Sequence, residues 1–523
     1  MNSTKATYNL LYEPWIDCRT DDEKICNFGL IDFNRNVNQI KEIIIPKVCG
    51  KCFAFYELAL HRFLNILYSV AIRISPWEDR DATKGLSNEE IELVEAYLKR
   101  FERKFDLMDE DFPFMQSTME DFAQMQVNYA PTQKNFVTSF VHLPSENAIN
   151  TNSLIGYNLI LENLNKDSST KDIINVIATK NKITPKEAAY HLLYLNAFAK
   201  CAGVAGCSSS SSTPELYVLF CGKTVGETIK TNLIPYEDNW TKPIWERDGV
   251  YSYYSEPERV DLIGYSFYPN RLCRFEWNDN TTMSMMYAPH NKKIWNDTSK
   301  NICRIVCEQF YQGVDKDALI KAKDDGAVTI KYSRTENWLH MLMSAIITNN
   351  EIPEHSQSAK NIFGGAVVLP KIITIVLYGR SADGKSGVYQ YSERIEQSVD
   401  SKILCKQKLV DYLDKYIRLV RSQFVITQKV IDKYYKILNK VNPHAENKVP
   451  FINQKISLYA HQKLNIVLDI LVSEVSENDI ETKMNKVFND IKMYTKSAIF
   501  EMLNENVLAA AQAYKSIVFG GKK

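Results

Sequence analysis

The sequence has no net charge, no membrane-length hydrophobic run and no hydrophobic leader. Its 63 Lys and Arg residues balance 63 Asp and Glu residues, which argues against a solitary protein that finds nucleic acid through bulk electrostatics. The longest apolar stretch, residues 363–378, contains Pro370 and Lys371 and is too short to span a bilayer. Residues 1–8 are polar and do not resemble the start of a signal peptide. We therefore expect a cytoplasmic protein with no membrane partner.

The motifs of common hydrolytic enzymes are also missing. The eight histidines form no HExxH motif, and no G-x-S-x-G nucleophile motif is present. The 11 cysteines are scattered, which does not suit a disulfide framework. Cys49 and Cys52 have the spacing of a zinc knuckle, but tetrahedral zinc needs four ligands, and the next pair, Cys303 and Cys307, lies far along the chain. We expect no enzymatic activity and no cofactor, and we interpret Cys49 and Cys52 as incidental.

The neutral total conceals two regions of opposite charge. Residues 101–150 carry a net charge of −5, whereas residues 401–450 carry +7. From residue 401, glycine and proline become rare and apolar residues recur at helical spacing. Later helices are expected over residues 453–473, 479–493 and 495–516, with the last two either separate or joined as one bent helix. We predict an α+β fold, with a large mixed domain over residues 1–400 and a C-terminal four-helix bundle over residues 401–523.

The octapeptide from Gly379 to Ser386 matches the nucleotide-binding pattern G-x-x-x-x-G-K-S/T. In such a loop Lys385 would reach the β- and γ-phosphates, and Ser386 would hold Mg²⁺. The residues that follow alternate as in a β-strand, whereas a phosphate-binding loop opens a helix. We therefore prefer a β-hairpin with its turn over residues 381–387, and keep a nucleotide hydrolase as an alternative.

Two other stretches allow two interpretations each. Residues 201–214 read CAGVAGCSSSSSTP, which is either a linker or a loop whose small residues let the backbone approach a ligand. Lys429, Lys433, Lys436 and Lys440 fall on one face of a predicted helix. Such a stripe is usually a solvated face, but charges of one sign repel each other unless an anion such as a phosphate backbone neutralises them.

Five short strings, in order along the chain, resemble the CasA family, the large subunit of the type I-E CRISPR Cascade surveillance complex. They are YNLLYEPWI at residues 8–16, FDL at 105–107 with PFMQ at 113–116, LPSEN at 143–147, PIWERD at 243–248 and PNRLCR at 269–274. In the third string Glu146 replaces the family's glycine. The predicted C-terminal bundle lies where the family has its own, so the resemblance covers nearly the whole chain.

The resemblance implies a DNA-reading subunit and not an enzyme. Such a subunit recognises the short motif beside the target, the PAM, as a duplex, and helps to separate the strands so that guide RNA can pair. Its partners would be the other Cascade subunits, the guide CRISPR RNA, the double-stranded target DNA and a recruited helicase-nuclease. A scaffold that bridges proteins without touching DNA is a further alternative.

The resemblance also places candidate DNA-binding residues. A DNA-contacting loop would fall on Phe140, Val141 and His142, a glycine loop on residues 202–207, and the strand-separating wedge on the hairpin tip at residues 381–386. The lysine stripe would guide a displaced DNA strand or the guide-bound duplex. Besides these lysines, the candidates are Phe140, Val141, His142, Asn147, Gly203, Gly206, Arg271, Arg274, Lys292, Lys293, Arg380, Ser381, Asp383 and Lys385.

Overall fold

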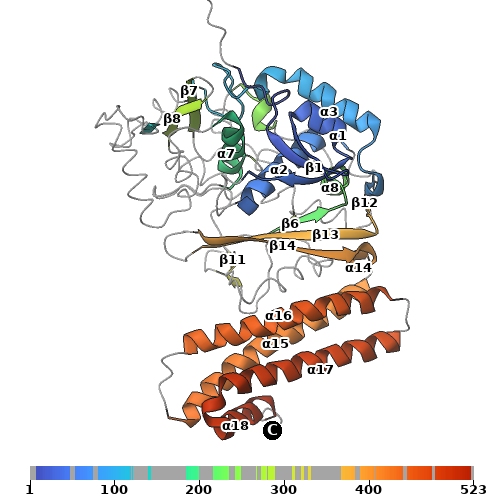
Figure 1. The fold of residues 1–523 in the computed structure, drawn as a ribbon, viewed down its shortest axis with the longest axis vertical. Helices are drawn as coiled ribbons and strands as arrows, with labels where there is room; N and C mark the ends of the chain where they lie inside the picture. Colours follow the sequence, from blue (N-terminus) through green and yellow to red (C-terminus); the bar gives the residue numbers. More distant parts are fainter. Residues whose placement is uncertain are drawn as a thin grey trace, which may run out of the picture. The chain divides into compact units, whose positions relative to one another are not determined.

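The computed structural model describes residues 7–46, 53–74, 80–118, 120–121, 139–142, 184–198, 216–234, 242–248, 267, 272–278, 281–288, 309–311, 320–322, 328–330, 367–382, 389–405, 407–439, 445–473 and 477–519. The described residues up to Glu396 form one compact unit, called unit 1 (Figure 1). Those from Gln397 onward form a second compact unit, called unit 2.

Unit 1 is built around helix α2 (Phe53–Ile72), which is buried along most of its length. The other described helices of this unit are α1 (Leu30–Asn36), α3 (Asn88–Arg100), α7 (Pro185–Phe198) and α8 (Val225–Asn232). Helix α3 starts at a capping box, in which Ser87 and Glu90 each accept a hydrogen bond from the other's backbone amide. Short 3-10 turns lie at Ala82–Lys84, Glu102–Phe105 and Ile244–Glu246.

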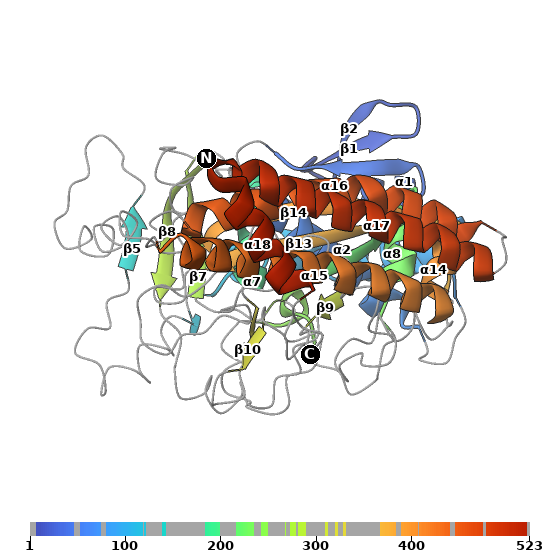
Figure 2. The ribbon, with the colours of Figure 1, turned by 90° about the horizontal axis from the view of Figure 1, so that it is seen from below.

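The described strands form three larger sheets and two short pairs. The first sheet consists of β1 (Ile16–Thr20), β2 (Ile25–Phe28) and β3 (Ile40–Ile44) in the order β2-β1-β3. Figure 2 shows β1 and β2 at the margin of unit 1. The second has the order β14-β13-β6-β9, from β6 (Leu216–Cys221), β9 (Gln309–Tyr311), β13 (Ile372–Ala382) and β14 (Tyr389–Asp400). The third has the order β5-β8-β7, from β5 (Ser139–His142), β7 (Leu272–Asn278) and β8 (Thr281–Ala288). The pairs are β4 (Arg80–Asp81) with β12 (Val367–Val368), and β10 (Ile320–Ala322) with β11 (Val328–Ile330).

Aromatic side chains fill the core around α2. The ring of Phe63 lies 6.5 Å from that of Trp15, 5.2 Å from that of Trp245 and 5.8 Å from that of Phe114, measured between centroids. All four side chains are buried. Tilted and edge-to-face pairs of this kind stabilise a fold by about 0.5–1.5 kcal/mol each beyond their buried area. They bring segments from distant parts of the sequence into one core.

The octapeptide from Gly379 to Ser386 begins inside a strand. Gly379 pairs with Leu216 of β6, and β13 continues to Ala382. From Tyr389 the chain forms β14, which is the sheet neighbour of β13, so a strand runs where a phosphate-binding loop would require a helix. The predicted pair of neighbouring strands is confirmed, and this strand does not fit a phosphate-binding loop. The turn itself, residues 383–388, lies outside the described residues.

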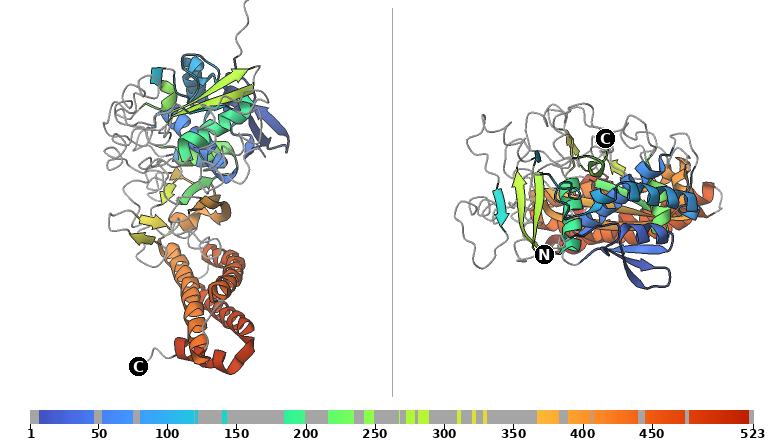
Figure 3. Two further views of the ribbon diagram at one scale, coloured as in Figure 1. Left: turned by 90° about the vertical axis from the view of Figure 1, so that its left-hand side faces the viewer. Right: turned by 90° about the horizontal axis from the view of Figure 1, so that it is seen from above.

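Unit 2 consists of helices, as predicted. After the short α14 (Ser401–Cys405) come α15 (Gln407–Ile437), α16 (Ala445–Val472), α17 (Glu477–Met502) and α18 (Val507–Val518). Helix α16 packs against both α15 and α17, and α18 packs against α15 (Figure 3). Buried residues recur at helical spacing on the inner faces, as at Ile452, Ile456 and Ala460. With the mixed unit 1, this confirms the predicted α+β fold that ends in a helical bundle.

Two helix boundaries differ from those predicted. Helix α16 begins at Ala445, not near residue 453, and includes Pro450. The chain has no break near residue 494, as in the alternative of a joined helix. The break lies further on, where the side chain of Asn506 accepts a hydrogen bond from the amide of Ala509 at 3.0 Å and caps α18. Tyr494 instead stays inside α17, where its ring stacks on that of Tyr459 with centroids 4.0 Å apart. Among the described residues, no helix is long and apolar enough to cross a membrane.

Candidate nucleic-acid interface

The first two family-like strings meet through backbone hydrogen bonds. The amide of Leu10 donates to the carbonyl of Phe105 at 2.9 Å, and the amide of Leu107 donates to the carbonyl of Tyr8 at 3.0 Å. The carboxylate of Asp106, which is 9% exposed, accepts from the amides of Tyr8 at 3.1 Å and Met108 at 2.9 Å. These strings therefore form one structural junction, held by the backbone and by one carboxylate.

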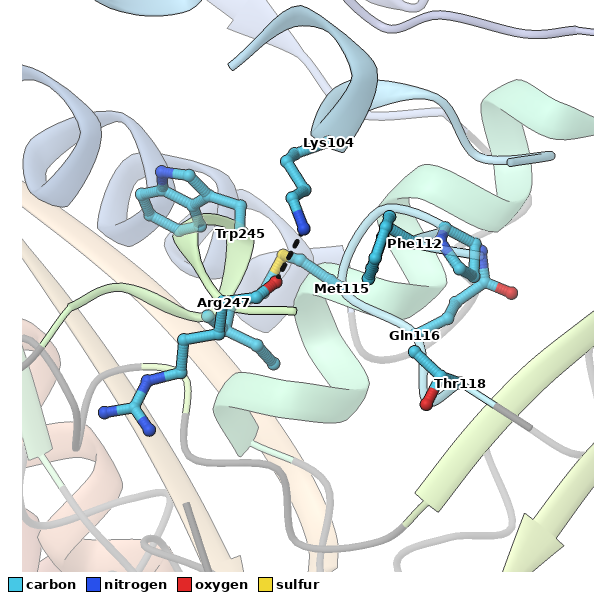
Figure 4. Close-up of a pocket in the computed structure, with 9 residues that line it drawn as sticks. Lys104, Phe112, Met115, Gln116, Thr118, Trp245 and Arg247 are labelled. Atoms are coloured by element: carbon cyan, nitrogen blue, oxygen red, sulfur yellow. Dashed lines mark hydrogen bonds between the residues drawn. The ribbon is translucent and has the colours of Figure 1, made fainter. Parts of the chain in front are cut away.

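The PIWERD string joins the same region through Lys104 (Figure 4). The Lys104 ammonium donates to the carbonyl of Arg247 at 3.1 Å and to the carboxylate of Asp248 at 2.6 Å, and this hydrogen bond lowers the pKa of Asp248. The same ammonium lies 3.6 Å from the centre of the Phe112 ring. A small pocket here is lined by Lys104, Phe112, Pro113, Met115, Gln116, Thr118, Ile244, Trp245 and Arg247. Because the ammonium already has partners within the protein, we interpret the pocket as a packing junction.

Gln116 attaches the third sheet to this junction. Its amide nitrogen donates to the carbonyl of Leu107 at 2.9 Å, and its amide oxygen accepts from the backbone of Phe275 in β7 at 2.8 Å. The neighbouring Arg274, one of the candidate DNA-binding residues, donates to the carbonyls of Ser117 at 3.3 Å and Glu110 at 2.7 Å. Arg274 therefore has a structural role, and its contact with DNA stays a prediction.

The segment predicted as a DNA-contacting loop is a strand. Phe140, Val141 and His142 lie in β5, and their backbones pair with residues 286, 285 and 284 of β8. The expectation of a loop at these residues is wrong, because they form a strand whose backbone N–H and C=O groups pair with β8 on one side. As the outer strand of the described sheet, β5 has no described strand on its other side. Whether this edge contacts DNA stays a prediction.

The hairpin predicted to act as a wedge continues past the described part of β6. Leu216, the first described residue of β6, pairs with Gly379, so β13 continues beyond β6 through Arg380 and Ser381 to Ala382. Figure 1 shows β13 and β14 running side by side along the unit. The structure thus places the two wedge candidates Arg380 and Ser381 on β13, directly after the last residue that pairs with the described part of β6.

The lysine stripe lies on α15. Lys429, Lys433 and Lys436 are exposed, whereas the intervening Val430 and Tyr434 are buried against the bundle. The predicted helix face is therefore formed by three of the four lysines. Exposure suits both interpretations of the stripe, a solvated face and a surface for phosphates.

The remaining candidates lie outside the described residues. They are Asn147, Gly203, Gly206, Arg271, Lys292, Lys293, Asp383, Lys385 and Lys440, and the same is true of Cys49 and Cys52. Within the described part of the chain, no group of three or more His, Cys, Asp or Glu side chains is arranged to hold a metal ion.

Sequence reasoning missed a buried cluster between α2 and the hairpin. The carboxylate of Glu57 accepts hydrogen bonds from the Tyr378 hydroxyl at 2.9 Å and from Nε of Arg394 at 3.0 Å. Burial raises the pKa of Glu57, and the positive charge of Arg394 opposes that rise. Burial also raises the pKa of Tyr378, with the Glu57 carboxylate adding to the effect. No local pattern signals this pair, because Glu57 and Arg394 are 337 positions apart.

Solved structures match the fold over nearly the whole chain. Thermus thermophilus CasA (Cse1) is 16% identical with a TM-score of 0.58, covering 98% of this chain and 100% of that one. Thermobifida fusca Cse1 is 13% identical with a TM-score of 0.61, covering 98% and 97% of the two chains. A chain of a CRISPR RNA-guided surveillance complex is 13% identical with a TM-score of 0.62, covering 97% and 98%. At these identities the likeness shows a shared fold.

The sequence itself identifies the family. No curated protein matches the chain. The model of the CRISPR-associated protein Cse1 family, however, matches residues 9–344. That match covers well over half of the chain and includes the five strings that resemble CasA, apart from Tyr8. The chain therefore belongs to the CRISPR-associated protein Cse1 family.

Proposed function

We propose that this chain is the large subunit of a type I-E CRISPR Cascade complex, in which it reads the PAM of double-stranded target DNA and promotes strand separation. The observation that carries the proposal is the Cse1 family match, together with a fold shared over 97% of the chain with a protein of a CRISPR RNA-guided surveillance complex. Its partners are the other Cascade subunits, the guide CRISPR RNA, the target duplex and a recruited helicase-nuclease. It acts in the cytoplasm as a binding subunit and not as an enzyme.

Two structural features support this function. In the hairpin of β13 and β14, β13 continues past the described part of β6, which suits a wedge that enters a duplex beside the PAM. Three lysines line an exposed helix face in unit 2, which suits a phosphate backbone. Residues 1–400 would read the PAM, and the bundle over residues 401–523 would guide DNA and help to recruit the helicase-nuclease.

The zero net charge fits a subunit of a larger assembly. With 63 positive and 63 negative side chains, the chain has no general attraction for DNA. Guide RNA and the other subunits supply most of the backbone pairing and contacts. We therefore expect the isolated chain to bind DNA weakly and without sequence preference at physiological salt.

Binding of the assembled complex to targets with permuted PAMs tests the proposal. Gel-shift titrations should show affinity that depends on the PAM when this chain is present, and lose that dependence when it is omitted. Equal PAM dependence with and without the chain would contradict the proposal. If PAM dependence is the same with and without the chain, and the chain still assembles with the other subunits, the alternative of a scaffold that does not touch DNA is favoured.

A further inference from the structure

Glu57 holds both strands of the hairpin beside the last described pairing of β13 with β6. Tyr378, which donates to Glu57 at 2.9 Å, immediately precedes Gly379, the last residue of β13 that pairs with the described part of β6. Arg394 on β14 donates to the same carboxylate at 3.0 Å. One side chain from α2 therefore contacts both strands near the point where the described pairing with β6 ends, and we call this point the root of the hairpin.

We propose that Glu57 is a positioning residue that fixes the direction of the β13–β14 hairpin, and thereby the efficiency with which its end separates the strands of target DNA. This inference rests on the proposed function, because it takes the hairpin as the wedge. Glu57 does not touch DNA in this proposal. It acts through Tyr378 and Arg394.

The residues around Glu57 restrict the movement of its side chain. The side chain is 13% exposed, and Leu58 and Phe63 of the same helix are completely buried in the core. Tyr378 is also completely buried. A hydrogen bond to a charged group is stronger than one between two neutral groups.

A small change in the direction of the strands at this root displaces the end of the hairpin by a larger distance. From Tyr378 to Ala382 the strand rises about 13 Å, at about 3.3 Å per residue. A tilt of about 10° at the root would move Ala382 by about 2 Å over that length. Misplacement of a functional group by about 1 Å can cost up to about 100-fold in rate. We therefore expect the loss of Glu57 to slow strand opening without removing the hairpin.

Glu57→Gln in the assembled complex, compared with Glu396→Gln, tests the inference. Glu396 is a matched control because it accepts from the same Arg394 at 2.6 Å, but its side chain is 60% exposed. Strand opening is followed by 2-aminopurine fluorescence next to the PAM, on a fully paired target and on one with unpaired bases beside the PAM. We expect Glu57→Gln to slow opening of the paired target about tenfold and to leave binding of the pre-opened target within about twofold. Glu396→Gln should change neither quantity.

The outcomes separate this inference from the proposed function. Equal losses on both targets, or no loss on either, would overturn the positioning role. Tyr378→Phe removes one hydrogen bond and keeps the ion pair, so it should give a smaller loss in the same direction even if Glu57→Gln does not assemble. Arg380→Ala with Lys385→Ala tests the hairpin end itself. If that pair leaves opening unchanged, the wedge function fails; if it slows opening and Glu57→Gln does not, only the positioning role fails.

Discussion

The backbone amide of Leu10 donates a hydrogen bond to the carbonyl of Phe105 at 2.9 Å. This bond joins two of the strings by which the family is recognised, and the carboxylate of Asp106 completes the junction. The PFMQ string reaches the same place through the bond from Gln116 to Leu107. These strings therefore form one junction in unit 1, and Gln116 also attaches the third sheet to it.

Asp106→Ala should destabilise unit 1. The substitution leaves the amides of Tyr8 and Met108 without their carboxylate partner, which we expect to lower the free energy of unfolding by about 3 kcal/mol. The first transition of a urea unfolding curve measures this. The control Asp111→Asn, at a side chain 66% exposed, should stay within about 0.5 kcal/mol. A loss below about 1 kcal/mol for Asp106→Ala would contradict the role of this junction.

Stability should depend on pH through Glu95. Hydrogen bonds from Arg35 and Lys99 lower its pKa to about 2, compared with about 4.3 in an unfolded chain. Glu95 therefore binds a proton less readily in the folded state than in the unfolded state. The stability that its ionised form contributes is present above pH 4.3 and is lost as the pH falls towards 2. Unfolding curves between pH 5 and pH 3 should show a steeper fall for the wild type than for Glu95→Gln. Glu92→Gln, an exposed position of the same helix, should retain the wild-type slope; a wild-type slope for Glu95→Gln would contradict the prediction.

Reversal of charge on the α15 stripe should weaken target binding at every sequence. Lys429→Glu with Lys436→Glu removes two exposed positive charges, so the slope of log K against log salt should become shallower by about 1.5–2. Filter-binding titrations of the assembled complex at several salt concentrations measure that slope. Lys515→Glu, an exposed lysine on α18, serves as the control. If the double variant retains the wild-type slope, the stripe is a solvated face.

Substitution on β5 should affect PAM preference. Phe140→Ala with His142→Ala changes two positions on the outer strand of the third sheet, and we expect affinity for the preferred PAM to fall about tenfold because base–aromatic contacts contribute about 1–3 kcal/mol each. Competition between PAM variants on the assembled complex measures the change. Ser139→Ala, on the same strand but outside the candidate residues, is the control. An unaltered ranking and affinity of PAMs would remove these residues from the interface.

Some features of the chain were correctly predicted because they depend on neighbours in the sequence. The alternating residues after Ser386 indicated a strand, and β14 begins at Tyr389. Apolar residues at helical spacing indicated the bundle, because a helix face repeats within a few residues. The position of β5 was not predicted, because its four residues form a strand by pairing with β8, far along the chain.

By itself, then, the sequence determined the α+β class, the C-terminal bundle, the hairpin in place of a nucleotide-binding loop, and the family. Each of these follows from local periodicity or from short strings read in order. Only the tertiary structure decided that Asp106 holds the first two strings together, that Arg274 bonds to backbone carbonyls, and that Glu57 contacts both strands of the hairpin. These partners are separated by between about one hundred and more than three hundred residues. They meet because the chain buries its apolar faces in one core, and that packing selects which buried polar groups become neighbours.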